Sequence, residues 1–312
     1  MTRRGLVLGA GGVLGAAWTI GALTALQEQY DWDPREAEVL LGTSAGSVLS
    51  AALACGVGVD TLLSHQRGEA VEGIDDDERD SGGALPPLPR PGIGSPRGVL
   101  NSAIHPFRVT PMAALSAMLP QGRGSLAPVG QLVDGVLPGG GWAPHPRAWM
   151  VATDYDTGRR TAFGRPGAPA AELRDAVMAS CAIPGWYTPV TIDGRRYVDG
   201  GACSPTSVDL VIGLELDEVV VLSPMTSLDY DAPGSVAARI ERRLRRIVTR
   251  RLVGEVKKVT ATGTKVTLLG PGSQDLHAIG ANLMDPRRRE RVLEVSLRTS
   301  AQALRQARGA AA

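Results

Sequence analysis

The chain has 312 residues, 43% of them hydrophobic and 21% charged, with 39 glycines and 22 prolines. This composition is typical of a globular protein with many tight turns, and the length allows one large domain with a substantial core. No apolar run approaches the roughly 18 residues that a membrane-spanning helix needs. Three cysteines without a C-x-x-C pair argue against a disulfide framework or a zinc site and favour a reducing, cytoplasmic compartment.

The net charge of +1 argues against a strongly basic nucleic-acid-binding protein, but it hides an uneven distribution of charge. From Arg239 to the end of the chain there are 17 basic and 6 acidic residues, a net charge of +11. The residues before Arg239 include 16 basic and 26 acidic side chains, a net charge of −10. The sequence therefore predicts an acidic body and a basic C-terminal part.

The N-terminal part predicts two buried strands, each followed by a helix. Residues 6–8 form a short apolar strand that runs into a glycine-rich loop, and apolar residues at helical spacing predict a helix over 16–28. The apolar run at 38–41 predicts a second strand, followed at once by G-T-S-A-G and an apolar helix near 46–54. Two arginines precede the first strand, but glycines interrupt the apolar stretch too early for an export signal.

The middle of the chain begins with an irregular segment at 72–98. This segment is rich in Pro, Gly and Asp and has no periodicity, which predicts a long mobile loop. A third strand is predicted at 148–153 and a helix near 170–180. The sequence T-I-D-G-R-R-Y-V-D-G-G then predicts a hairpin whose turn is Asp193-Gly194 and whose second strand ends at Asp199.

The C-terminal part continues the alternation of strands and helices. The expected strands lie at 218–223 and 264–269, and the expected long helices lie near 235–260 and 287–308. Such an alternation predicts an α/β fold with a largely parallel central sheet covered by helices on both faces. Because no repeat or linker interrupts the pattern, we expect one domain over 1–312, with an insertion at about 72–98 and a basic helical part from about 235.

The sequence G-T-S-A-G, from Gly42 to Gly46, matches the G-x-S-x-G pattern of a nucleophile elbow. In such a turn the serine, here Ser44, lies between a strand and a helix with its hydroxyl exposed, and small residues let the chain bend tightly. The N-terminus of the following helix points at the reacting group, where it favours negative charge. The alternative is a glycine-lined turn with a capping serine.

A glycine-rich loop, G-A-G-G-V-L-G from Gly9 to Gly15, follows the first strand and has three interpretations. The first is a dinucleotide-binding loop, but its spacing is G-x-G-x-x-x-G, and Leu41 and Gly42 stand where an acidic residue is expected. The second is an oxyanion hole, in which successive glycine N–H groups converge on developing negative charge. The third is a tight turn that binds nothing.

A third motif, D-G-G at Asp199 to Gly201, is on its own a common turn. The three motifs in this order, however, make the chain similar to the patatin-like phospholipase family. The sequences A-T-D-Y-D-T-G-R at 152–159 and A-S-C-A-I-P-G-W-Y-T-P-V at 179–190 resemble further segments of that family. The resemblance covers about residues 5–224, and we interpret the remaining C-terminal part as the rest of the same domain.

The resemblance implies a three-layer α/β/α fold and a serine acyl hydrolase that cleaves acyl esters of lipids without a cofactor or metal. On this pattern Ser44 is the nucleophile and Asp199 takes its proton. An aspartate with an ordinary pKa of about 3.9 does this poorly unless its site raises the pKa. The N–H groups of Gly11 and Gly12 would form the oxyanion hole. The glycines that would shape the site are Gly9, Gly15, Gly42, Gly46 and Gly200.

Several alternatives to this mechanism are open at the level of sequence. His277 follows Asp199 and would complete the Ser…Asp…His order of an α/β-hydrolase triad, although a surface or structural role is simpler. The chain could instead bind a nucleotide or dinucleotide with the Gly9–Gly15 loop, or be an inactive relative that binds lipid. One position departs from the family pattern, because Leu14 stands where a basic residue is usual, which removes a positive charge near the loop.

Two segments suggest contact with lipid. At 236–259, apolar residues recur at steps of three and four between arginines and lysines. This predicts a basic amphipathic helix whose apolar face packs on the core with the arginines in water, or which also contacts an anionic membrane. The apolar insert at 99–130 is interpreted, with the loop at 72–98, as a lid or acyl-chain wall or as an ordinary helical insert. The acidic run at 75–77 lacks the spacing of a calcium loop, so a solvated loop is expected there.

Overall fold

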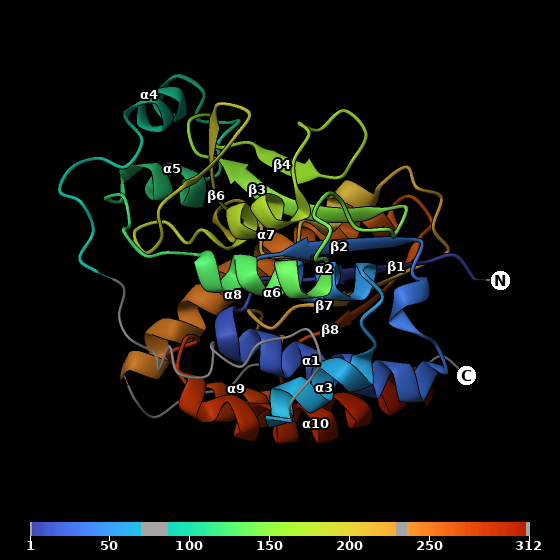
Figure 1. Ribbon diagram of the computed structural model, residues 1–312. Coiled ribbons are helices and arrows are strands. Elements are labelled where there is room, and N and C mark those ends of the chain that lie inside the picture. Colours follow the sequence, from blue (N-terminus) through green and yellow to red (C-terminus); the bar gives the residue numbers. More distant parts are fainter. Residues whose placement is uncertain (1, 70–86, 229–235, 310–312) are drawn as a thin grey trace.

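The computed structural model describes residues 2–69, 87–228 and 236–309 (Figure 1). Most of the loop expected at 72–98 therefore lies outside the described residues, as does the acidic run at 75–77. From residue 87 the chain has no regular structure until Ser95, which is the N-cap of a helix.

Among the described residues, the sheet at the centre of the molecule has eight strands: β1 (Arg4–Leu8), β2 (Val39–Thr43), β3 (Ala148–Asp154), β4 (Arg160–Phe163), β5 (Val190–Ile192), β6 (Arg195–Asp199), β7 (Glu218–Leu222) and β8 (Lys265–Leu269). Their order is β5-β6-β3-β2-β1-β7-β8, and β4 also pairs with β3. The strands from β3 through β2, β1 and β7 to β8 are parallel. The pairs that involve β4, β5 and β6 are antiparallel.

Helices surround this sheet (Figure 1). They are α1 (Gly12–Tyr30), α2 (Ala45–Ala54), α3 (Val59–Arg67), α4 (Pro96–Ile104), α5 (Pro111–Met118), α6 (Ala127–Val136), α7 (Leu173–Cys181), α8 (Val236–Thr260), α9 (Ser273–Ile279) and α10 (Arg289–Gly309). Short 3-10 turns are η1 (Pro34–Glu36), η3 (Gly200–Ala202), η4 (Val208–Val211) and η5 (Pro286–Arg288). The two long helices α1 and α10 pack against each other along one side.

The side chains of the central strands divide the core into two parts. Leu6 and Leu8 of β1 belong to a cluster shared with α1, α2, α7 and α10. Val7 of the same strand belongs to a second cluster, shared with α8 and η4. Because helices cover both faces of these parallel strands, the strands are apolar throughout rather than alternately polar. The expected α/β/α fold with a largely parallel sheet is confirmed.

Most elements agree with the sequence predictions. Every predicted strand is present, and both residues of the Asp193-Gly194 turn have positive φ angles (48° and 69°), as a two-residue hairpin prefers. The predictions missed β4, α3 and α6, and they specified no separate helix at α4, α5 or α9. Strand β4 is only four residues long, and α6 contains a proline and two glycines, so neither carries a clear periodic signal.

Helix α8 is present, but its first half does not turn its apolar side to the core. Leu252 is buried as predicted, whereas Leu244 and Ile247 are 53% and 54% exposed. Arg245 is buried instead, because it pairs with Glu241 and donates to backbone carbonyls. The expectation that the arginines of this helix all lie in water is therefore wrong. Among the described residues, no helix has both the length and the hydrophobicity needed to cross a membrane.

The turn from β2 into α2 depends on glycines that lie directly against other backbone atoms. A Cβ atom at Gly46 would overlap the carbonyl group of Leu8. A Cβ atom at Gly42 would lie 2.5 Å from the Gly46 oxygen and from the Cα of Ser47. Only glycine therefore allows α2 to begin so close to the end of β1. This contact places the start of α2 beside the glycine loop at one edge of the sheet.

Gly46→Ala is expected to destabilise the protein by roughly 4 kcal/mol or more, because the Leu8 backbone cannot move without disturbing the sheet. Gly254→Ala is the control, since Gly254 lies in α8 with nothing within 4 Å of its Cβ position. Alanine there is expected to stabilise the helix by about 0.5–1 kcal/mol. Urea unfolding followed by circular dichroism measures both. A Gly46→Ala variant as stable as the unchanged protein would contradict this packing.

Candidate active site

Ser44 occupies the turn between β2 and α2 with backbone angles (φ 54°, ψ −126°) that residues other than glycine rarely adopt. Its N–H donates to the Ser180 hydroxyl at 2.8 Å, and that hydroxyl donates to the Val151 carbonyl at 2.6 Å. Its carbonyl accepts the N–H and the hydroxyl of Ser47, each at 2.7 Å. The backbone of Ser44 is thus held on both sides, while the residue lines a pocket.

The register of the sheet brings Asp199 next to Ser44. On β3, Val151 pairs with Thr43, the residue before Ser44. The next residue of β3, Ala152, pairs with Asp199 at the end of β6. Ser44 directly follows the partner of Val151, and Asp199 is the partner of Ala152. Pairing with adjacent residues of β3 therefore brings Ser44 and Asp199 close together, although they are far apart in the sequence.

The carboxyl group of Asp199 is buried, with only 6% of the residue exposed. It accepts the N–H of Gly201 at 2.7 Å. Burial raises the pKa of Asp199 from 3.8 to about 6, although the nearby Ser44 side chain and the Gly201 N–H both act in the opposite direction. A carboxylate with this pKa can take up a proton near neutral pH far better than an exposed aspartate.

The glycine loop is held at both ends and leaves backbone donors at its centre. The N–H groups of Gly9, Ala10 and Leu14 donate to carbonyls at 2.8–2.9 Å. Within the described part of the chain, no carbonyl accepts the N–H groups of Gly11 or Gly12. Gly12 has a φ of 60° and lines the same pocket as the serine. The donors that the sequence singled out thus lie at the start of α1, beside this pocket.

Pro224 covers one side of the glycine loop. A Cβ atom at Gly11 would lie 2.6 Å from the Pro224 ring, and one at Gly15 would lie 3.1 Å from it. The carbonyl of Pro224 accepts a hydrogen bond from the buried Arg245 of α8 at 2.6 Å. Protein atoms therefore fill the space beside these glycines, which a pyrophosphate in a dinucleotide site would need to approach.

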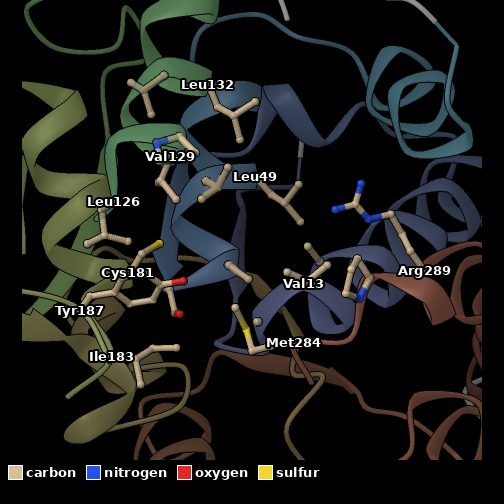
Figure 2. Close-up of a pocket in the computed structure, with 18 of the residues that line it drawn as sticks. Val13, Leu49, Leu126, Val129, Leu132, Cys181, Ile183, Tyr187, Met284 and Arg289 are labelled. Carbon is tan, nitrogen blue, oxygen red and sulfur yellow. The ribbon is translucent and has the colours of Figure 1, made fainter. Parts of the chain in front are cut away.

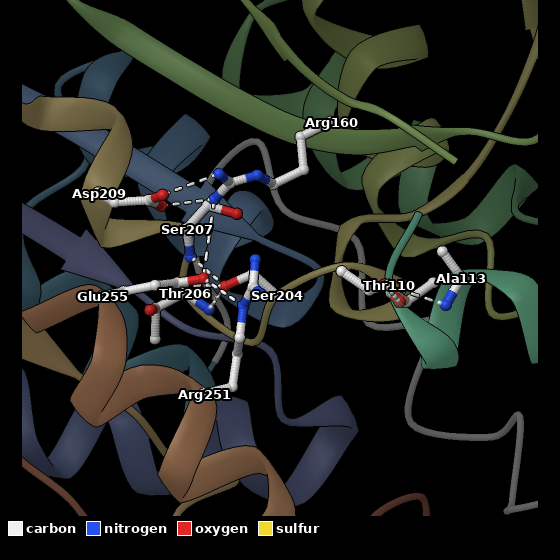
Figure 3. A network of polar contacts seen from close by, with 10 residues as sticks. Thr110, Ala113, Arg160, Ser204, Thr206, Ser207, Asp209, Arg251 and Glu255 are labelled. Carbon is white, nitrogen blue, oxygen red and sulfur yellow. Dashed lines mark hydrogen bonds and ion pairs between the residues drawn. The ribbon is translucent and has the colours of Figure 1, made fainter. Parts of the chain in front are cut away.

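A buried ionic network lies behind the turn that follows β6 (Figure 3). Glu255 of α8 is 1% exposed and accepts the hydroxyl of Ser204 at 2.8 Å, while the Ser204 oxygen accepts the N–H of Ser207 at 2.8 Å. Arg160 of β4 makes two hydrogen bonds to Asp209 and lies 3.8 Å from Glu255. Burial, reinforced by Asp209, raises the pKa of Glu255. The network therefore connects α8 and β4 to the segment that follows the candidate carboxylate.

An apolar pocket of about 510 Å³ lies beside Ser44 and Gly12. This volume falls within the range of small-molecule sites, about 300–1,000 Å³. Figure 2 shows one wall formed by apolar side chains of α6 and neighbouring segments, among them Leu126, Val129, Leu132, Cys181 and Tyr187. Arg289, at the start of α10, lies on the opposite side and is the only permanently charged side chain among the described lining residues.

The other candidates from the sequence lie outside this arrangement. His277 is exposed on α9 and is not among the described residues that line the pocket. The histidine that lines it is His65, which the sequence did not single out. Leu14 is fully buried in the core, so the basic residue usual there would have to enter this core. Among the described residues, no group of three or more His, Cys, Asp or Glu side chains could hold a metal ion.

Sequence reasoning missed the residues that support the site from behind. Ser180 lies inside a segment already noted for its family resemblance, and its only signal is a polar residue on the buried side of a helix. Glu255 is a lone acidic residue in a basic stretch, which is a weak signal for a buried charge. Arg245 is surrounded by other arginines, so nothing in its own position marks it as buried.

Comparison with known proteins agrees with the motifs. A family model described as Patatin-like phospholipase matches residues 6–212, a range that includes the glycine loop, Ser44 and Asp199. Among solved structures, the chain is similar to VipD from Legionella pneumophila, with 13% sequence identity and a TM-score of 0.49. That match covers 98% of this chain and 67% of the VipD chain.

The raised pKa predicts how the stability of an Asp199→Asn variant depends on pH. Because the folded pKa (about 6) exceeds the ordinary pKa of an aspartate in the unfolded chain (3.8), ionised Asp199 costs stability, and this cost is absent below about pH 4 and complete above about pH 7. Asparagine keeps a hydrogen-bond acceptor but cannot ionise. We therefore expect Asp199→Asn to be more stable than the unchanged protein near pH 8, by up to about 3 kcal/mol, and equally stable near pH 4.

Asp209→Asn is the control with the opposite sign. Burial would raise the pKa of Asp209, but its hydrogen bonds with Arg160 lower it overall, so asparagine there is expected to destabilise the protein near pH 8. Thermal unfolding at the two pH values measures both variants. An Asp199→Asn variant that is less stable than the unchanged protein at both pH values would contradict the raised pKa.

Proposed function

Because the chain belongs to the patatin-like phospholipase family, we propose that it hydrolyses acyl esters of lipids with a Ser–Asp dyad. Ser44 is the nucleophile, Asp199 accepts its proton, and the N–H groups of Gly11 and Gly12 form the oxyanion hole. The observation that carries this proposal is a buried carboxyl group that the pairing of β3 brings next to Ser44 and whose pKa is raised to about 6.

In the first half of the reaction, the Oγ atom of Ser44 attacks the ester carbonyl carbon while its proton moves to Asp199. The carbonyl oxygen becomes an oxyanion, which the N–H groups of Gly11 and Gly12 stabilise together with the N-terminus of α2. When this intermediate collapses, the bond to the leaving alcohol breaks and the alcohol takes the proton from Asp199. The acyl group remains bound to Ser44 as an ester.

In the second half, water attacks the acyl ester and gives a proton to Asp199. A second oxyanion forms in the same place and collapses to release the carboxylic acid, while Asp199 returns the proton to Ser44. Asp199 must therefore be ionised at the start of each half and protonated in the middle. A pKa of about 6 suits both states near neutral pH.

The backbone around Ser44 supports the proposal because it holds the nucleophile in one orientation. The hydrogen bonds of its N–H and carbonyl groups fix the strained turn, so little reorganisation is needed at the moment of attack. The apolar wall around Leu126 and Val129 suits an acyl chain, and Arg289 on the opposite side suits a polar or anionic head group (Figure 2).

The proposed steps need neither a cofactor nor a metal ion. The three free cysteines favour a reducing compartment, so we place the enzyme in the cytoplasm. A lipid substrate held in a bilayer would also bring the protein to a membrane surface.

Covalent labelling by a fluorophosphonate tests whether Ser44 is the nucleophile. The unchanged protein is expected to react at Ser44, and Ser44→Ala is expected to lose labelling and to lower kcat by about 10⁴-fold or more. Ser125→Ala is the matched control, because Ser125 lines the same pocket but takes no part in the mechanism. It is expected to keep both activities. Mass spectrometry of the labelled peptide and hydrolysis of nitrophenyl esters measure these results.

Two outcomes would contradict the proposal in different ways. Labelling of Ser44→Ala at the unchanged rate would mean that another residue is the nucleophile. An unchanged protein that binds lipid but hydrolyses neither short nor long acyl esters would support the inactive relative instead.

A further inference from the structure

Exposed large apolar side chains are concentrated in one short part of the chain. Of the fourteen found among the described residues, nine lie between residues 88 and 119, a segment that we call the apolar arm. Single exposed apolar residues are common on protein surfaces, but a cluster of this size indicates a site of interaction. The nine residues are Leu88, Ile93, Leu100, Ile104, Phe107, Met112, Leu115, Met118 and Leu119.

The apolar side chains of the arm lie along one side of each of its helices. On α4, Leu100 and Ile104 are four residues apart, and on α5, Met112, Leu115 and Met118 follow at steps of three. Such spacings place residues on a common helix face. The two helices pack together at one corner of the molecule (Figure 1). The exposed apolar residues of the arm therefore occur as stripes rather than as isolated positions.

Polar contacts fix the other side of the arm to the protein. Ser95 caps α4 and donates a hydrogen bond to Asp156 at 2.6 Å, and Asp156 pairs with Arg196 of β6. The side-chain amide of Asn101 donates to the Thr157 carbonyl at 2.9 Å. These contacts attach the arm to the turn between β3 and β4. Because these contacts hold the arm in one orientation, the apolar stripes stay on its exposed side.

The arm carries positive charge and no carboxylate. Between residues 88 and 119 the chain contains three arginines and no Asp or Glu. All three of these arginines are exposed, namely Arg90, Arg97 and Arg108. Apolar residues flanked by cations alone complement a bilayer with anionic head groups, whose interior takes the apolar side chains and whose surface attracts the arginines.

The arm lies next to segments that line the pocket beside the serine. Pro87, directly before the arm, and Trp186 both line that pocket. Leu119, at the end of the arm, lies 3.9 Å from the Cβ position of Gly185, the neighbour of Trp186. The backbone of Gly122 packs directly against the backbone of Trp186. A surface that covered the arm would therefore also lie next to the pocket.

Helix α8 is the other basic surface with exposed apolar residues, but it suits a bilayer less well. Arg245 is turned inward, and the helix also carries the acidic Glu241. Among the described residues that line the pocket, none belongs to α8. A bilayer on α8 would therefore not be placed at the pocket.

We propose that the apolar arm docks the protein on a bilayer that contains anionic lipids. Phe107, which is 101% exposed in the connection between α4 and α5, enters the acyl region together with the two apolar stripes. The three arginines of the arm lie at the head groups. The inference rests on the proposed function, since docking here would present lipid to the pocket, but docking itself needs no turnover.

Co-sedimentation with lipid vesicles tests the docking surface. Vesicles of phosphatidylcholine mixed with phosphatidylglycerol are compared with vesicles of phosphatidylcholine alone. Phe107→Asp is expected to weaken binding to the mixed vesicles on the order of tenfold or more. Arg97→Gln and Arg108→Gln are expected to weaken it roughly fivefold each, and only on the anionic vesicles. The matched controls on α8, Leu244→Asp and Arg243→Gln, are expected to bind as the unchanged protein does.

Hydrolysis of a short soluble ester separates this proposal from the proposed function. Phe107→Asp is expected to hydrolyse such an ester at the unchanged rate and to lose activity on vesicles in proportion to binding. If the unchanged protein hydrolyses no ester but its vesicle binding still depends on Phe107, the docking surface stands and the hydrolase proposal fails.

Three results would overturn the docking surface. The first is equal vesicle binding by Phe107→Asp and the unchanged protein. The second is loss of binding in Leu244→Asp instead. The third is a dimer of the unchanged protein that Phe107→Asp dissociates in analytical ultracentrifugation, because a second copy would then cover the arm.

Discussion

Close contact between backbone segments with no room for a Cβ atom is the constraint on which the candidate site depends. At Gly46 the start of α2 lies against the carbonyl of Leu8, and at Gly200 the end of β6 lies against the carbonyl of Val151. These contacts bring the ends of β1, β2 and β6 together at one edge of the sheet. The strained conformation of Ser44 persists because this packing and the backbone hydrogen bonds of Ser44 allow the turn no other conformation.

The helix on the far side of the sheet supports the same site with buried charges. Glu255 accepts a hydrogen bond from the Ser204 hydroxyl, and the carbonyl of the next residue, Pro205, accepts the N–H of Ala10 in the glycine loop at 2.8 Å. Arg245 of the same helix donates a hydrogen bond to the carbonyl of Pro224, which covers that loop. Each buried charge has a partner, as a low-dielectric interior requires. Helix α8 thus links the turn after the carboxylate with the proposed oxyanion donors, and this explains why part of its basic side faces inward.

The sequence predicts the sheet, the hairpin and the three motifs because their signals are local: apolar runs, turn residues and glycine spacing. It does not by itself predict the contact between Ser44 and Asp199, since that contact follows from pairing on β3, and only the family resemblance suggested it. The sequence wrongly predicted that the apolar side of α8 packs on the core along its whole length. Leu244 and Ile247 form the same helical pattern whether they face the core or the solvent. The hydrogen bond between Glu255 and Ser204 joins residues that are far apart in the chain, so no local sequence pattern predicts it.

The central claim is that the buried carboxyl group of Asp199 takes the proton of Ser44. The pH dependence of kcat/KM for a soluble ester tests it most directly. We expect kcat/KM to rise with pH through an apparent pKa of about 6 and then to level off, because only the ionised carboxylate can accept the proton. The same apparent pKa is expected in His65→Gln, and Asp199→Asn is expected to lose the rise together with the activity. A rise that persists in Asp199→Asn, or that disappears in His65→Gln, would contradict the claim.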